Sequence, residues 1–249
     1  MIKPFAIDNY LSDKQQALLT VIPITIIHLY FYNLTGYHAS MRHVDYAYFI
    51  KTTLDQRIPF IPSFDIFYLF TFIYPFLIIV YLLKKAQLTI YNFYRIYIAA
   101  IVMILFCTAI WSHFPNHFVL RVNNSELAHY GFWGAMVAHT YSNITDWNAC
   151  PSFHIAISWF ILRMSQMYTK KTEWPFVALF FAIAASTVLI RIHYIADICF
   201  GILVAELACN VLLRNFEKYS IFQHWSKTSL FYGYILILGA MVLLLFLGV

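Results

Sequence analysis

The stretch FDIFYLFTFIYPFLIIVYLL, residues 64–83, holds twenty residues and one charged side chain, Asp65. An α-helix rises about 1.5 Å per residue, so a stretch of this length crosses the roughly 30 Å hydrocarbon core of a bilayer. A helix is expected because it satisfies its own backbone hydrogen bonds in a solvent that offers none. This segment therefore predicts a transmembrane helix.

Other apolar stretches are long enough, or nearly so, to cross a bilayer in the same way. They lie at about 17–34, 93–110, 153–170, 175–192, 194–213 and 229–248. We therefore expect an all-α, polytopic membrane helical bundle with a six-helix core and a seventh, C-terminal span at 229–248. Because neither an internal repeat nor a low-complexity linker interrupts the chain, residues 1–249 are interpreted as a single membrane domain.

The composition agrees with a protein embedded in lipid. Hydrophobic residues make up 62% of the chain and charged residues 11%, against roughly 25% charged in a typical soluble domain. The net charge of +5 is assigned to loops that face the cytoplasm rather than to nucleic-acid binding, because no basic run exceeds two residues. The four cysteines are scattered, which indicates neither a disulfide framework nor a CxxC metal site.

The distribution of Lys and Arg predicts the orientation, because cytoplasmic loops carry an excess of both. With the N-terminus in the cytoplasm, eleven of the sixteen basic residues fall on the inner side. These are Lys3, Lys14, Lys84, Lys85, Arg95, Arg163, Lys170, Lys171, Arg214, Lys218 and Lys227, whereas the outer five are Arg42, Lys51, Arg57, Arg121 and Arg191. This orientation places the 111–152 loop and the starts of the fourth and sixth spans on the extracytoplasmic side.

The sequence CPSFH, residues 150–154, stands directly before the fourth span and is the first candidate site. Pro and Ser ahead of an apolar run are helix-start signals, and Ser152 is the expected N-cap. The free N–H groups and the positive dipole end of a helix start suit a phosphate, and His154 would lie in the first turn. The alternative is that Ser152 only caps the span and that His154 is an interfacial polar residue.

The sequence RIHYIAD, residues 191–197, stands at the start of the sixth span. His193 and Asp197 are four residues apart, which predicts that they share one helix face. The Asp197 carboxylate would orient the imidazole and leave its other nitrogen free for nucleophilic attack. The alternatives are that Asp197 only stabilises the helix dipole, or that both residues bind zinc with His154 as a third ligand.

Two arginines are candidate ligands for a phosphate. Arg121 lies in the predicted outer loop, and a guanidinium close to two histidines can bind phosphoryl oxygens in a bidentate manner. Arg191 precedes His193 by two residues, so on a continuous helix the two side chains would diverge. The alternative for a lone Arg in an outer loop is a solvated charge.

Over roughly residues 50–215 the pattern resembles the type 2 phosphatidic acid phosphatase superfamily. That family carries Lys-x6-Arg-Pro, Pro-Ser-Gly-His and Ser-Arg-x5-His-x3-Asp stretches on a six-helix membrane core. The second stretch reads PSFH here, at residues 151–154. The third reads Ser186-Thr187, with His193 and Asp197 at the family spacing.

The departures from the family pattern point to one branch of it. Of the first stretch only Arg121 remains, with Phe114 at the lysine position and Val122 at the proline, and Thr187 replaces the third-stretch arginine. Together with DQRIPFIP at residues 55–62, this is similar to the branch of fungal inositol phosphorylceramide synthase and the sphingomyelin synthases. Those enzymes move a phospho-headgroup between lipids. A degenerate, inactive member is the alternative.

The resemblance implies a role for each matching residue. His193 would be the nucleophile that forms a phosphohistidine, and Asp197 would orient it. His154 would protonate the leaving oxygen and then activate water or an acceptor hydroxyl. Arg121 and the backbone N–H groups around Ser152 would bind the phosphoryl oxygens. The resemblance implies no metal ion and no other cofactor, and the expected partner is a phospholipid or another lipid phosphate.

Three classes of function stay open on the sequence alone. The leading hypothesis is a metal-independent lipid phosphotransferase or lipid phosphate phosphatase, with its site on the extracytoplasmic face. A small transporter or channel would continue polar residues across the bilayer, whereas the spans keep most ionisable groups at one end, apart from Arg163 and Glu206. A non-catalytic membrane scaffold would turn over no lipid. The acceptor and the oligomeric state are left open.

Overall fold

The computed structural model describes residues 13–41, 50–85, 89–171 and 173–215, and helices dominate these ranges. The helices that form the bundle are α1 (Asp13–Met41), α3 (Asp65–Lys85), α4 (Ile90–His113), α7 (Phe153–Thr169), α8 (Trp174–Leu189) and α9 (Ile195–Leu207), which a π-helical turn, η4 (Ala208–Leu213), continues. Shorter elements are α2 (Thr53–Arg57), the 3-10 turn η3 (Pro62–Phe64), α5 (Asn124–Ala128) and α6 (Gly131–Asn143). The expected seventh span at 229–248 lies outside the described residues.

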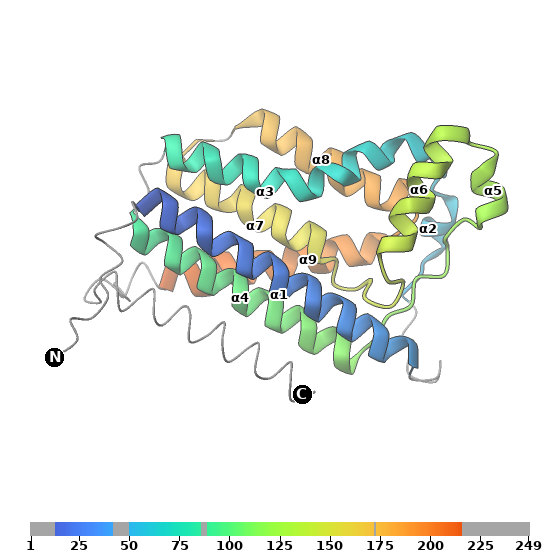
Figure 1. Ribbon diagram of the computed structural model, residues 1–249, viewed down its shortest axis with the longest axis horizontal. Coiled ribbons are helices and arrows are strands. Elements are labelled where there is room, and N and C mark those ends of the chain that lie inside the picture. The colour runs from blue at the N-terminus through green and yellow to red at the C-terminus, as the bar shows by residue number, and fades with distance from the viewer. Residues whose placement is uncertain (1–12, 42–49, 86–88, 172, 216–249) are drawn as a thin grey trace.

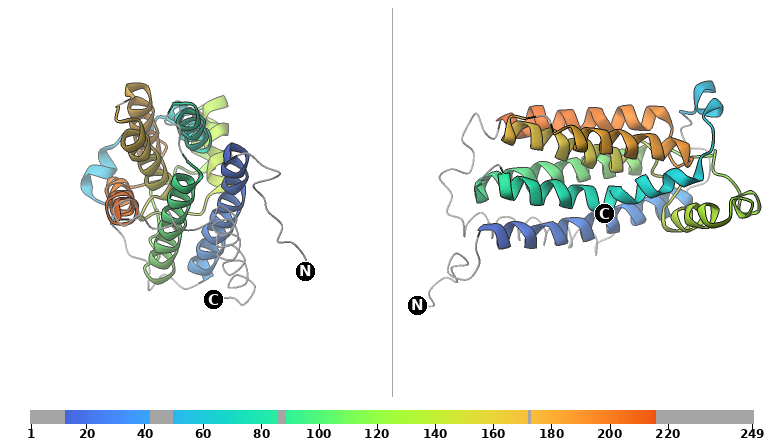
Figure 2. Two further views of the ribbon diagram at one scale, coloured as in Figure 1. Left: turned by 90° about the vertical axis from the view of Figure 1, so that its left-hand side faces the viewer. Right: turned by 90° about the horizontal axis from the view of Figure 1, so that it is seen from above.

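The bundle helices run side by side along the long axis of the molecule (Figure 1, Figure 2). Helix α1 packs on α4, α3 packs on α7 and α8, and α7 packs closely on α9. The shorter helices α2, α5 and α6 gather at one end (Figure 1). The predicted all-α membrane bundle is confirmed, and each of the six core stretches corresponds to one of these helices.

The apolar character of the helices identifies an integral membrane protein. Among the described residues, the segments Pro62–Lys85, Tyr91–His113 and Ile195–Leu213 are long and apolar enough to span a bilayer, and Trp174–Leu189 is a shorter apolar helix. Only 33% of the most apolar window of Pro62–Lys85 is buried within the protein. The remaining apolar side chains need lipid around them, because exposing them to water costs free energy in proportion to their area.

Helix α7 lies in the core of the bundle, where Ile155, Ala156 and Phe160 are fully buried. Its start approaches α9 closely at Gly201, since a Cβ atom on that glycine would lie 2.6 Å from the carbonyl oxygen of Ser152. A residue without a side chain is therefore required there for the two helices to meet. This contact brings the two predicted motifs, which begin α7 and α9, to the same place.

Candidate active site

The starts of α7 and α9 lie at the end of the bundle that carries α2, α5 and α6 (Figure 1). One backbone hydrogen bond joins the two starts directly, from the Ser152 N–H to the carbonyl oxygen of Asp197 at 3.1 Å. The polar side chains of both motifs are therefore held together by main chain as well as by side-chain contacts.

His193 is fixed on both sides of its ring. Its Nδ1 lies 3.2 Å from Oδ2 of Asp197, and its Nε2 lies 3.0 Å from the Ser152 hydroxyl oxygen. Asp197 and Ser152 are fully buried and His193 is 8% exposed. Because an ionised carboxylate can only accept, the proton belongs on Nδ1, and Nε2 is left to accept from the Ser152 hydroxyl. Nε2 is thus the basic nitrogen of the ring.

The His193–Asp197 contact forms, but not on a helix face as the spacing predicted. Helix α8 ends at Leu189 and α9 begins only at Ile195, so His193 lies in the turn between them. Asp197, in the first turn of α9, reaches back to accept from the Tyr194 N–H at 2.9 Å as well as to meet the imidazole. The pairing is therefore a feature of the helix cap.

His154 approaches from the other helix. It is the second residue of α7, and the centroids of its ring and the His193 ring are 6.0 Å apart with the planes inclined by 60°. Its Nε2 lies 3.1 Å from the Tyr68 hydroxyl oxygen on α3. Two imidazoles from separate helix starts therefore converge, and a carboxylate supports one of them.

Ser152 occupies the predicted N-cap position of α7, but its side chain does not cap the helix. Its hydroxyl is used by His193 instead, and its own N–H by Asp197. The first N–H groups of an α-helix have no acceptor within the helix, so those of the first turn of α7 stay suited to an anion.

Comparison with known proteins gives a family for this arrangement. A family model described as the PAP2 superfamily matches residues 37–211, well over half of the chain. The chain belongs to the PAP2 superfamily. Neither a curated protein nor a solved structure matches it. Membership in this superfamily supports an enzyme of the phosphatase or phosphotransferase kind, embedded in a membrane, with a lipid phosphate as the suggested substrate.

The arginine predicted to bind phosphate is engaged with the protein. Two nitrogens of the Arg121 guanidinium donate to the carbonyl oxygens of Tyr141 and Ile144, at 3.3 and 3.2 Å. The guanidinium also lies 5.0 Å from the centre of the Tyr141 ring, and its Nε is buried without a partner among the described residues. Arg121 thus ties the segment before α5 to the end of α6 and keeps one donor unused.

Arg191 lies in the turn between α8 and α9 with φ of 55°, so the continuous helix considered for it does not exist. Its guanidinium lies 5.9 Å from the centre of the Phe60 ring. No hydrogen bond within the described ranges joins Arg121 or Arg191 to either histidine. The structure therefore brings together His154, His193, Asp197 and Ser152, and leaves the two arginines at the margin of that cluster.

The position where PAP2 relatives of the usual pattern carry the third-stretch arginine has a structural role here. Thr187 is fully buried, and its hydroxyl donates to the Ala184 carbonyl oxygen at 2.8 Å. Its own carbonyl oxygen accepts from the N–H groups of Ile192 and His193, at 3.0 and 3.1 Å. Phe114, at the lysine position, is the C-cap residue that follows α4 and is 56% exposed. Of the two replaced positions, Thr187 thus supports the turn between α8 and α9, and Phe114 carries an exposed ring.

Sequence reasoning missed two residues that support the site. Tyr68 meets His154, and nothing in the apolar stretch around it indicated that contact. Asp55 accepts from the N–H of Ile195 at 2.9 Å, so it caps the helix that carries Asp197. Its place in the DQRIPFIP stretch was the available signal.

The Asp55 carboxyl group that caps α9 has a shifted pKa. Burial acts to raise the pKa of Asp55, but hydrogen bonds from the Ile195 N–H and from the Thr52 hydroxyl and N–H outweigh it. The pKa therefore lies below its ordinary value of 3.8. The carboxylate is consequently the form that the folded protein stabilises.

The zinc alternative requires at least three ligand side chains around one ion. Within the described ranges, no three His, Cys, Asp or Glu side chains are grouped as ligands of a metal ion. A site with His193, Asp197 and His154 around one ion therefore has no support from their arrangement.

Proposed function

We propose that this protein is a metal-independent lipid phosphotransferase or lipid phosphate phosphatase that works through a phosphohistidine. The observation that carries the proposal is the position of His193. Its Nδ1 is held by Asp197, and its basic Nε2 lies on the side of Ser152, with the His154 ring 6.0 Å away between centroids. A nucleophile, an orienting carboxylate and a second acid–base group are the parts that covalent phosphoryl transfer needs.

In the first step the Nε2 lone pair of His193 attacks the phosphorus atom, and the bond from phosphorus to the leaving oxygen breaks. His154 gives that oxygen a proton. The His193 imidazole gains positive charge as the nitrogen–phosphorus bond forms, and the buried Asp197 carboxylate stabilises that charge. The Ser152 hydroxyl, released from Nε2, is then free to donate to a phosphoryl oxygen.

In the second step a water molecule or an acceptor hydroxyl attacks the phosphohistidine. His154 takes the proton from that oxygen, and the nitrogen–phosphorus bond breaks to restore Nε2. The N–H groups at the start of α7 and the unused Nε–H of Arg121 are the donors proposed for the phosphoryl oxygens. Transfer to a lipid hydroxyl is the outcome that the resemblance to the inositol phosphorylceramide synthase branch favours.

The proposed orientation has the N-terminus in the cytoplasm and the site on the extracytoplasmic face. The excess of Lys and Arg in the predicted inner segments supports it, eleven residues of sixteen. Cysteine labelling from either side of intact vesicles tests it, with single cysteines placed at His113 and at Lys170. The orientation is wrong if a membrane-impermeant reagent reaches Lys170→Cys from outside.

A transport path has less support, because the two ionisable residues that interrupted the spans bind each other. Arg163 Nε donates to Glu206 Oε1 at 2.7 Å, and the Trp159 indole donates to the same oxygen at 2.8 Å. Paired charges of this kind stabilise contacts between helices in lipid. They offer no row of free polar groups across the bundle.

The deciding experiment compares His193→Ala with His113→Ala in purified protein. His113 is an exposed histidine at the end of α4 whose ring meets the carbonyl of its own helix, so it controls for loss of an imidazole. Phosphate release and headgroup exchange are measured on phosphatidate, prenyl pyrophosphate and phosphatidylinositol. We expect His193→Ala to abolish turnover and His113→Ala to preserve it.

Two outcomes overturn the proposal. Unchanged turnover in His193→Ala removes the nucleophile. A wild-type protein that turns over none of these lipids at any pH indicates an inactive scaffold instead. As a direct check, acid-labile label from 32P-phosphatidate is expected on wild-type protein quenched during turnover and is expected to be missing from His193→Ala.

A further inference from the structure

The short helices α5 and α6 pack on each other at the site end of the bundle (Figure 1). Gly134 permits their close approach, because a Cβ atom on this glycine would lie 1.9 Å from the carbonyl oxygen of Leu127. Leu127 is buried beneath this contact. The start of α6 is therefore held in a fixed position relative to α5.

Three exposed aromatic side chains gather at the start of α6, and we refer to Tyr130, Phe132 and Trp133 as the aromatic tip. They are 41%, 71% and 37% exposed. The rings of Phe132 and Trp133 contact each other, with 5.2 Å between their centroids. Apolar area in water costs free energy, and a contiguous exposed patch of it marks a surface that meets lipid or another protein.

Two contacts give the level of α6 relative to the bilayer. The Tyr130 ring lies 5.3 Å from the Phe60 ring between centroids, and Phe60 stands two residues before the apolar segment Pro62–Lys85. Further along α6, the Thr140 hydroxyl lies 3.0 and 3.1 Å from the two carboxylate oxygens of Asp65, the first residue of α3. The 24 residues of Pro62–Lys85 span about 36 Å, more than the roughly 30 Å of hydrocarbon, so α6 is level with the headgroup layer.

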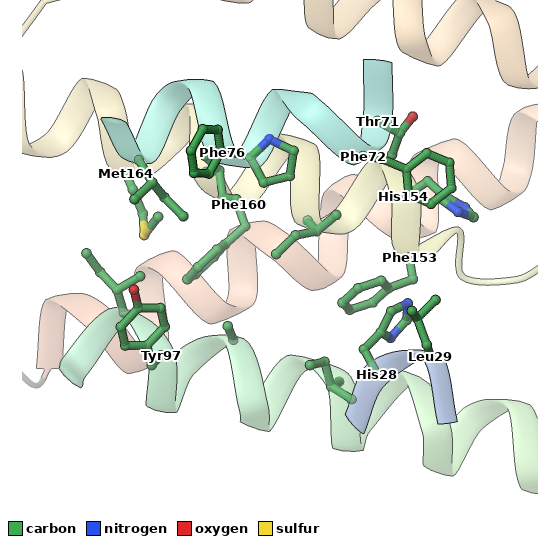
Figure 3. Close-up of a pocket in the computed structure, with 17 residues that line it drawn as sticks. His28, Leu29, Thr71, Phe72, Phe76, Tyr97, Phe153, His154, Phe160 and Met164 are labelled. Carbon is green, nitrogen blue, oxygen red and sulfur yellow. The ribbon is translucent and has the colours of Figure 1, made fainter. Parts of the chain in front are cut away.

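The lipid-facing surface of α3 extends up to α6. Phe72 and Phe76, which line the cavity drawn in Figure 3, are 59% and 52% exposed, and Ile66 nearer the start of α3 is 43% exposed. Ile66 directly follows Asp65, which contacts α6, and α6 packs on the start of α3. The aromatic tip therefore belongs to an element that borders a lipid-covered surface.

The exposed face of α6 changes from apolar to polar along the helix. Phe132 and His139 are seven residues apart, so they lie on one face about two turns from each other, and both are exposed. The exposed residues beyond His139 are Ser142 and Asn143, and Nδ2 of Asn143 lies 3.3 Å from Nε2 of His139. The start of α6 thus suits a less polar environment than its end.

A cation adjoins the aromatic tip. The Arg191 guanidinium lies 5.9 Å from the centre of the Phe60 ring, on which Tyr130 packs. Aromatic rings are enriched at membrane–water interfaces because they combine an apolar body with a polar edge, and a guanidinium attracts lipid phosphates. At the opposite end of the bundle Trp174 begins α8, is 72% exposed and follows Lys171 by three residues, so exposed aromatic rings occur near both ends.

We propose that the aromatic tip inserts into the headgroup layer of the leaflet that surrounds the site end, so that the bilayer surface is the partner of the first turn of α6. This contact fixes the depth of the helix starts that carry His154 and His193. The inference rests on the embedding of the protein in a membrane and is independent of the proposed function.

The insertion is tested by fluorescence quenching in nanodiscs of phosphatidylcholine that is brominated close to the headgroup. The chain has six tryptophans, so removing a quenched one lowers the quenched fraction of the total emission, and removing an unquenched one raises it. We expect Trp133→Phe to lower this fraction. A fraction that stays constant or rises in Trp133→Phe would overturn the inference.

Trp147→Phe is the matched control for this measurement. Trp147 lies at the same end of the bundle, stacked on His117 with 4.4 Å between centroids, and His117 contacts Asp146 at 3.1 Å. Because these contacts are with polar groups of the protein, we expect brominated lipid to spare Trp147, and its removal should raise the quenched fraction.

A second measurement places a nitroxide spin label at Phe132→Cys in protein that carries Cys150→Ala and Cys199→Ala, since the other two native cysteines are buried. We expect the label to collide more with oxygen, which concentrates in lipid, than with a water-soluble nickel chelate. His139→Cys, on the same face, should show the reverse. More collisions with nickel at position 132 would place the tip in water, and protection from both reagents would place it against a second copy or another protein. Either result would overturn the inference and leave the catalytic proposal intact.

Discussion

The two histidines lie on two sides of the candidate site, and the contacts on these sides differ. On the α9 side, the ring of His193 is bonded at both nitrogens, and the carboxylate and hydroxyl that hold it are fully buried. On the α3 and α1 side, the described contacts of His154 include one hydrogen bond, to Tyr68, and His154 also lines a cavity between α1, α3, α4 and α7.

This difference teaches how one small bundle can combine fixed chemistry with a variable ligand. A nucleophile works best when its neighbours are set before the reaction, because no free energy is then spent on reorganisation. A side of the site that borders a cavity keeps space in which a ligand can lie. Each of the following predictions changes a contact in or beside the site, and each uses a matched substitution for comparison.

The largest effect is expected from Asp197→Asn, which removes the carboxylate that holds His193 on the α9 side. The amide has no negative charge to support the His193 imidazolium and can favour the wrong tautomer, so kcat/KM should fall roughly 10²- to 10⁴-fold. Asp55→Asn is the control, because Asp55 caps the same helix at Ile195 without touching a histidine. A comparable loss of turnover in Asp55→Asn would mean that the helix cap, and not the charge beside His193, controls the chemistry.

A smaller effect is expected from Gly201→Ala, which pushes the two helix starts apart. The added Cβ would meet the Ser152 carbonyl oxygen at 2.6 Å, and main-chain atoms must move to relieve the contact. We expect the melting temperature in detergent to fall, as for roughly 1–3 kcal/mol of overpacking, and kcat to fall about tenfold. Cys199→Val, which adds bulk on the exposed side of α9, should leave both unchanged. Full activity in Gly201→Ala would show that the site tolerates a displaced α7.

The α3 side of the site is tested by Tyr68→Phe, which removes one hydrogen bond to His154. The expected loss in kcat/KM is about five- to tenfold, together with a shift of one limb of the pH–rate profile, because the hydroxyl biases the protonation of the ring. Tyr74→Phe is the control on the same helix, since the Tyr74 hydroxyl donates to the Phe176 carbonyl oxygen at 3.1 Å, away from the histidines. Identical pH profiles for Tyr68→Phe and wild type would remove Tyr68 from the machinery.

The smallest effect concerns stability in acid and belongs to Asp55. Because its pKa is lower in the folded protein than the ordinary 3.8, its contribution is present above that value and is lost as the pH falls through the folded pKa. Wild-type melting temperatures in detergent should therefore decline below about pH 4 more steeply than those of Asp55→Asn. Parallel curves for the two proteins would contradict the cap.

The amino-acid sequence predicts much of the α9 side of the site, around His193, and little of the α3 and α1 side, around His154. The apolar stretches predicted the bundle helices, and PSFH and the His193–Asp197 spacing predicted which side chains meet. The predicted reason for the His193–Asp197 contact, a shared helix face, was wrong. His193 lies in a turn that the Thr187 carbonyl supports and not on a helix. Local sequence fixes the residues of a cap, whereas the exact course of a turn depends on what packs against it.

The other contacts could not be read from local patterns because each joins distant parts of the chain. Tyr68 is 86 residues from His154, and Asp55 is 140 residues from Ile195. Tyrosines are numerous in the apolar stretches, so nothing marked Tyr68 among them. The same holds for Gly201, whose role is visible only from the main-chain oxygen that lies above it.

The direct bond from the Ser152 N–H to the Asp197 carbonyl has a consequence for how the protein responds to its membrane. Membranes differ in thickness by a few Å, and helices adapt to mismatch by tilting. Since this bond joins the starts of α7 and α9, both are expected to tilt as one unit, which keeps the distance between the two imidazoles. Helices α1 and α3 can adjust separately, so a thicker bilayer should alter KM while the turnover number stays nearly constant.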